Sequence, residues 1–147
     1  MSPQDARFEK STLATPEAIS DLIDQVMAFL SEQGVETRVT HHTGLVLDEM
    51  LTNLATHGKC PDRPAKIVVV VGPQKVTGEI VDSGLPFDPR LAPEPSLDLT
   101  ADQRPIGGLG LYLVRKLSCT LEYARRNDQN CTTFAINRSE RDESRQA

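Results

Sequence analysis

Polar side chains recur every four residues along one segment with helical periodicity: Glu49, Asn53 and His57. Residues four apart lie on the same face of a helix, so these three side chains form one stripe. Apolar residues border the stripe, which would turn a carboxylate and a carboxamide toward a pocket, where they could hold a polar ligand. Gly58 is typical of a helix end. An isolated stripe of this kind is more often a solvated helix edge, so its meaning depends on the rest of the chain.

A further carboxylate is predicted at the end of a strand that runs from Gln74 to Asp82. Strands alternate their side chains between two faces, so Val76, Ile80 and Asp82 share one face, and the apolar pair marks it as the core face. Asp82 therefore points inward, where a carboxylate needs a partner. Gly84 follows closely and allows a ligand or a tight turn to approach the backbone.

Glycines mark the start of a later helix, in the segment Ile106-Gly107-Gly108-Leu109-Gly110. The N–H groups at a helix N-terminus are free and the helix dipole is positive there, so this segment is suited to bind phosphate. It lacks the dinucleotide-binding pattern, because the third glycine position holds Leu113. The Gly-x-x-x-x-Gly-Lys phosphate loop and the signatures of eukaryotic protein kinases are absent from the sequence as well.

The elements that position these groups follow from apolar periodicity and capping residues. Thr15 is a hydroxyl cap followed by proline and an acid, which is typical of a helix start, and Gly34 ends that helix. The helix that carries the polar stripe is expected at 36–57, and its poorly apolar middle, 40–44, leaves room for a distortion. Strands are expected at 7–13, 67–71, 74–82, 120–125 and 132–137, with a polar turn at 127–130.

A proline-rich segment at 85–106 separates the two halves of the chain and shows no periodicity. A segment of that length without regular structure is usually a functional lid or is disordered. The order of elements does not alternate strands with helices, so a doubly wound parallel sheet is not expected. The predicted fold class is α+β, a two-layer sandwich in which a mixed, mostly antiparallel sheet carries its helices on one face.

The chain has 147 residues, of which 38% are hydrophobic and 25% charged, a composition suited to one globular domain. We predict this domain at 7–138 and a charged, disordered tail at 139–147. The formal charge of −5 argues against direct binding to nucleic acid, and no apolar run is long enough to span a membrane. Three cysteines without a Cys-x-x-Cys spacing favour reduced thiols and a cytoplasmic protein.

In their order and spacing, Glu49-x-x-x-Asn53, Asp82-x-Gly84 and Gly108-x-Gly110 resemble the sequence boxes of the GHKL (Bergerat-fold) ATP-binding superfamily. Within this superfamily, the chain resembles the stand-alone anti-sigma-factor serine kinases in two respects. The helix ends on Asn53-x-x-x-His57, and no other domain is expected in the sequence. The resemblance covers residues 8–138.

This resemblance implies a role for each matching residue. Glu49 would be the base that accepts the proton of an incoming serine hydroxyl, and Asn53 would hold Mg²⁺. Asp82 would accept a hydrogen bond from the adenine amino group, and Gly84 would let the base approach closely. The other nucleotide-binding residues that the resemblance implies are His57, Gly108, Leu109, Gly110 and Thr132.

Two positions depart from the family pattern. Asn130-Cys131-Thr132 stands where glycines usually precede a threonine, and Cys119 stands where an acidic residue is expected. His57 and Arg104 lie where phosphates or the lid could reach them, and a structural role is equally open for each.

The resemblance implies a Mg-ATP-dependent serine/threonine kinase and anti-sigma factor. It would phosphorylate a STAS-type anti-anti-sigma partner and also bind a sigma factor or similar regulator; whether it forms a homodimer is open. The alternative is a binding module that uses ATP or ADP only to choose its protein partners, but such a module needs no base at Glu49. The catalytic half of a histidine kinase is less favoured, because no dimerisation helix pair precedes the domain.

Overall fold

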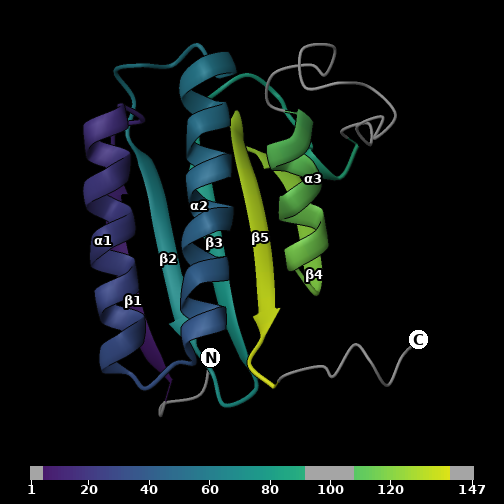
Figure 1. The fold of residues 1–147 in the computed structure, drawn as a ribbon. Helices are drawn as coiled ribbons and strands as arrows, with labels where there is room; N and C mark the ends of the chain where they lie inside the picture. The colour runs from purple at the N-terminus through teal and green to yellow at the C-terminus, as the bar shows by residue number, and fades with distance from the viewer. Residues whose placement is uncertain (1–4, 92–107, 140–147) are drawn as a thin grey trace.

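The computed structural model of this chain describes residues 5–91 and 108–139. This part of the chain forms three α-helices and one five-stranded sheet. Figure 1 shows that the helices all lie on the same face of the sheet. In chain order the elements are β1 (Ala6–Thr12), α1 (Pro16–Glu32), α2 (Thr37–His57), β2 (Ala65–Val71), β3 (Lys75–Asp82), the 3₁₀ turn η1 (Pro89–Leu91), α3 (Gly108–Leu117), β4 (Thr120–Arg126) and β5 (Gln129–Asn137). The predicted α+β fold class is confirmed. Most of the predicted lid, 92–106, and of the predicted tail, 140–147, lies outside the described residues.

The strands are arranged in the order β1-β2-β3-β5-β4, and each neighbouring pair is antiparallel. The two predicted hairpins are therefore confirmed, and a parallel pair, which a mixed sheet would include, does not occur among the described strands. The predicted four-residue turn at 127–130 is wrong. Asn127 and Asp128 both have positive φ, 52° and 62°, so they close the hairpin as a two-residue turn. β5 consequently begins at Gln129 and contains Asn130.

α1 and α2 pack side by side along the sheet (Figure 1). The predicted cap of α1 is confirmed, because the Thr15 side chain accepts a hydrogen bond from the Ala18 N–H at 3.2 Å. The predicted distortion at 40–44 is wrong, since α2 is helical throughout. Its poorly apolar middle has another cause: a Cβ on Gly44 would lie 3.1 Å from the Met27 sulfur of α1. Small side chains at this point let the two helices approach closely.

The core lies between the sheet and the inner faces of α1 and α2. The strands β2, β3 and β5 contribute apolar side chains to it. Its largest fully buried members include Leu47, Leu51, Ile67, Ile80, Phe134 and Ile136. Truncating any of these leucines or isoleucines to alanine would cost about 2–5 kcal/mol. Within residues 5–91 and 108–139, none of the helices combines the length and apolar character that crossing a bilayer requires. The core thus holds α2 in place and leaves the border of its inner face, with Glu49 and Asn53, half-buried.

Candidate functional site

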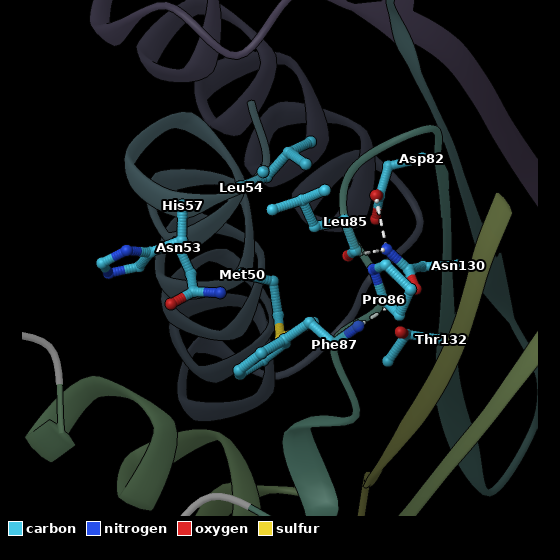
Figure 2. Close-up of a pocket in the computed structure, with 11 residues that line it drawn as sticks. Met50, Asn53, Leu54, His57, Asp82, Leu85, Pro86, Phe87, Asn130 and Thr132 are labelled. Carbon is cyan, nitrogen blue, oxygen red and sulfur yellow. Dashed lines mark hydrogen bonds between the residues drawn. The ribbon is translucent and has the colours of Figure 1, made fainter. Parts of the chain in front are cut away.

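A pocket of about 210 Å³ opens between the C-terminal half of α2, the loop that follows β3 and the start of β5 (Figure 2). Met50, Leu54 and Phe87 give it apolar walls. Pockets that enclose whole small molecules are usually about 300–1,000 Å³. This one therefore has room for a flat group such as a nucleobase, and the rest of a larger ligand would extend out of it.

Four of the predicted site residues line this one pocket: Asn53, His57, Asp82 and Thr132. In Figure 2, Asn53 and His57 lie on the α2 side, and Asp82 and Thr132 lie across the pocket from them. Thr132 is buried and Asn53 half-buried, whereas His57 is exposed and its ring points away from Asp82. The sequence patterns on the helix and on the strands therefore do meet at one place.

The Asp82 side chain is buried at the end of β3, as its position in the strand predicted. Its Oδ1 accepts two hydrogen bonds of 2.9 Å, one from the Gly84 N–H and one from Nδ2 of Asn130. Its Oδ2 has no hydrogen-bond partner within the described part of the chain. Because Asp82 lines the pocket, this oxygen can accept a hydrogen bond from a bound ligand. The pocket is therefore suited to a flat ligand with an N–H group, as adenine is.

The two glycines of this region serve close packing. A Cβ on Gly84 would lie 2.8 Å from Cδ1 of Leu54 and 3.2 Å from Cα of Gly58, and the Leu85 N–H donates to the Gly58 carbonyl oxygen at 3.0 Å. Gly84 is not among the residues that line the pocket. Gly58 has an ordinary φ of −73°, and the left-handed residue after α2 is Lys59, with φ of 56°. Both glycines thus let the loop after β3 dock onto the end of α2.

The Glu49 carboxylate lies one turn before Asn53 and outside the pocket, against the first turn of α3. A Cβ on Gly110 would overlap Oε2 of Glu49, so a larger residue there would displace the Glu49 carboxylate. Burial raises the pKa of Glu49 above its usual value, and the charge of Asp48 raises it further. A carboxylate whose pKa is nearer neutrality is a stronger proton acceptor. Gly108 and Leu109 belong to the same helical turn, and the Leu109 side chain is not among those that the structure describes.

Asn53 provides an amide oxygen, and the Glu49 carboxylate is one helical turn away. Magnesium in phosphate-binding sites usually keeps several waters and takes only one or two protein ligands, completed by the phosphates. The Asn53 amide oxygen, which faces the pocket, fits such a site. Across residues 5–91 and 108–139 no three His, Cys, Asp or Glu side chains gather to hold a metal by themselves.

Asn130 is the site residue that the sequence patterns missed. It lines the pocket, is 4% exposed and hydrogen-bonds to Asp82. It was expected in a turn, but Asn127-Asp128 alone forms the turn. Such a dipeptide between two strands is a signal for a two-residue hairpin, which would have extended β5 to include Asn130.

The chain is similar to a known protein family and to a curated relative. The sequence profile of the family described as "Histidine kinase-like ATPase domain" matches residues 12–136. A relative from Bordetella bronchiseptica, described as "Serine/threonine-protein kinase BtrW", is 35% identical over 92 residues, or 61% of this chain and 65% of the relative. The alignment thus spans slightly less than two thirds of that relative.

Two solved structures share the fold. The RsbU and RsbW domains of Rv1364c from Mycobacterium tuberculosis match with a TM-score of 0.65 and 15% identity, over 92% of this chain and 33% of that one. The catalytic domain of the histidine kinase ThkA, in a nucleotide-free form, matches with a TM-score of 0.51 and 16% identity, over 92% of this chain and 99% of that one. At these identities the likeness concerns the fold alone.

Proposed function

Because the family match extends over most of the sequence, this chain belongs to the histidine kinase-like ATPase domain family, and from this membership we propose that it is a Mg-ATP-dependent serine/threonine kinase. The family is the one that the resemblance to the GHKL superfamily predicted. Its substrate is a small STAS-type anti-anti-sigma protein, and it also binds a sigma factor or a comparable regulator. The relative named as a serine/threonine-protein kinase and the structural neighbour that contains an RsbW domain support this proposal.

The observation that carries the proposal is the position of the Glu49 carboxylate, one turn before Asn53 and against Gly110 at the start of α3. The first turn of a helix has free N–H groups and attracts phosphate. A carboxylate beside that place, with a raised pKa, can take a proton from a hydroxyl that approaches the terminal phosphate. Phosphoryl transfer requires mainly positioning and neutralisation of charge, so a single base is sufficient.

The residues of the chain divide this work between two regions. Asp82 accepts the hydrogen bond of the adenine amino group inside the pocket, and the backbone at Gly108, Leu109 and Gly110 holds the phosphates outside it. Asn53 holds Mg²⁺, which when bound neutralises charge on the phosphates. Glu49 orients the serine hydroxyl of the partner and removes its proton. His57 and Thr132, which also line the pocket, complete the nucleotide contacts.

Incubation of the chain with γ-labelled ATP, Mg²⁺ and purified STAS proteins tests this proposal. We expect label on one partner, dependent on Mg²⁺ and lost when the acceptor serine, located by mass spectrometry, is changed to alanine. The partner carrying that alanine is the matched control, because it should still bind. If no partner is labelled, while ATP and ADP still change which partner is bound, the chain is a nucleotide-gated binding module. If the chain binds no ATP at all, both functions are excluded.

A further inference from the structure

Asn130 is the second residue of β5 and lies directly opposite Asp82, the last residue of β3. Both side chains are on the helix-covered face of the sheet and are buried, with 4% and 8% exposed. A carboxamide has two N–H donors and one acceptor oxygen, and leaving these unpaired in the interior is costly. The partners of this amide therefore indicate its role.

The partners of the Asn130 amide fix its orientation. Its oxygen accepts hydrogen bonds from the Phe87 N–H, the Tyr123 hydroxyl and Nη1 of Arg125. Its nitrogen donates at 2.9 Å to Oδ1 of Asp82 and at 2.9 Å to the Leu85 carbonyl oxygen. A third, longer bond of 3.4 Å runs from this nitrogen to the Gly84 carbonyl oxygen. A reversed amide would turn its NH₂ toward three donors and its oxygen toward three acceptors, so a single orientation satisfies the whole network.

This fixed amide determines what Asp82 offers to the pocket. Oδ1 of Asp82 is occupied by the Asn130 amide and by the Gly84 N–H. Oδ2 is left without a hydrogen bond from any of the described residues, in a side chain that lines the pocket. Because the amide cannot turn, the carboxylate is held in one orientation and presents a pure acceptor to a ligand.

We propose that Asn130 is the positioning residue that makes the pocket select a 6-amino purine over a 6-oxo purine, an inference that rests on the nucleotide-binding function proposed above. Adenine carries an N–H donor at its 6-position, whereas guanine and hypoxanthine carry an acceptor oxygen. The held Oδ2 of Asp82 bonds to the former and repels the latter. Without Asn130 only the Gly84 N–H still holds Oδ1, so the carboxylate is less firmly oriented and the discrimination falls.

A merely structural role for Asn130 would have a different signature. The same amide also holds the loop after β3, through the Leu85 carbonyl and the Phe87 N–H, and both residues line the pocket. Loss of loop order alone would weaken every purine nucleotide by the same factor. The ratio of affinities for two bases, instead of either affinity alone, therefore separates positioning of Asp82 from support of the loop.

The test is calorimetric titration with ADP and with IDP, whose bases differ in an amino against an oxo group. We expect wild type to prefer ADP at least about tenfold, and Asn130→Ala to reduce this ratio to less than about threefold. Gln129→Ala is the matched control, because the Gln129 amide reaches the Ser83 hydroxyl at 3.3 Å and lies one position away on the same strand. The control should keep the wild-type ratio.

An unchanged ADP-to-IDP ratio in Asn130→Ala overturns the inference, even if both affinities fall. If circular dichroism shows that this variant does not fold, Tyr123→Phe replaces it, since it removes one donor to the amide from the edge strand β4. We expect a smaller loss of the ratio there, and no loss again overturns the inference. A wild type that binds both nucleotides equally overturns it while nucleotide binding stands. A wild type that binds neither removes the proposed function itself.

Discussion

At the end of the sheet opposite the pocket, Arg138 follows β5 and forms a closed polar network, in which the guanidinium and the Glu36 carboxylate pair with each other. Its Nε and Nη2 donate to the two carboxylate oxygens of Glu36, at 2.9 and 3.3 Å, and its Nη1 donates to the Gly72 carbonyl at 2.9 Å. The guanidinium lowers the pKa of Glu36, and the carboxylate raises the pKa of Arg138. This network ties the start of α2 to the β2–β3 turn and to the end of β5.

The pocket end of the same strands is also rich in hydrogen bonds, yet one acceptor there has no partner among the described residues. Asn130 and Gly84 occupy Oδ1 of Asp82, and Oδ2 has no donor within the described part of the chain. Nearby, the Glu49 carboxylate has a raised pKa caused by burial and by a like charge, without a cation among the causes. A closed network stabilises the fold, whereas an incomplete one beside a pocket indicates a ligand. Mutations at the two ends should therefore separate stability from function.

The largest effect is expected for Glu49→Ala at the pocket end. The loss of a general base should reduce phosphate transfer about 10²–10⁴-fold. Binding of Mg-ATP should stay close to wild type, because Glu49 does not line the pocket. Single-turnover transfer to the STAS partner and calorimetry with ATP measure the two quantities. A variant that phosphorylates the partner at the normal rate would show that Glu49 is not the base.

A smaller loss, this time of binding, is expected for Asn53→Ala. Removal of the amide oxygen should weaken Mg-ATP at least about tenfold, or 1.4 kcal/mol. Thr52→Ala is the matched control, since Thr52 is the adjacent exposed residue of α2 and is not in the pocket. Calorimetry with and without Mg²⁺ measures the effect. Wild-type affinity in Asn53→Ala, or an equal loss in the control, would rule out Asn53 as the metal ligand.

At the closed end, Arg138→Ala should act on stability alone. The Arg138–Glu36 ion pair is partly exposed, so its loss and that of the backbone hydrogen bonds should cost about 1 kcal/mol. Urea denaturation measures this cost, and calorimetry should show unchanged affinity for ATP. If nucleotide binding fell together with stability, the two ends would be coupled, and the contrast between them would not hold.

Most of the fold could be predicted because its determinants are local. Thr15 caps α1, and alternation along β3 places Asp82 inward, and both follow from patterns within a few residues. The stripe of Asn53 and His57 follows from helical periodicity in the same way. Predictions of this kind need no knowledge of which segments meet in space.

The features that were missed depend on contacts between distant segments. The poorly apolar middle of α2 is explained by Gly44 against Met27 of another helix. The close approach of Glu49 to Gly110, where a Cβ would overlap the carboxylate, involves positions far apart in the sequence. Asn130 was misplaced because the geometry of two turn residues shifted the strand boundary, and its pairing with Asp82 is set by the register of the sheet.

The smallest effect is expected for Asp48→Asn, which changes the surroundings of the base and leaves the base itself in place. Glu49 acts in its deprotonated form, so transfer should fall as the pH is lowered through its pKa, which is raised first by burial and then by Asp48. Removal of the Asp48 charge should lower this pKa, so the acid limb of the rate profile should move to lower pH. High salt should reduce the shift, because screening weakens interactions between exposed charges.

Asp21→Asn is the control, since it removes the same charge from an exposed position on α1 and should leave the profile in place. An equal shift in both variants would assign the effect to net charge, and no shift in Asp48→Asn would mean that Glu49 does not set the acid limb.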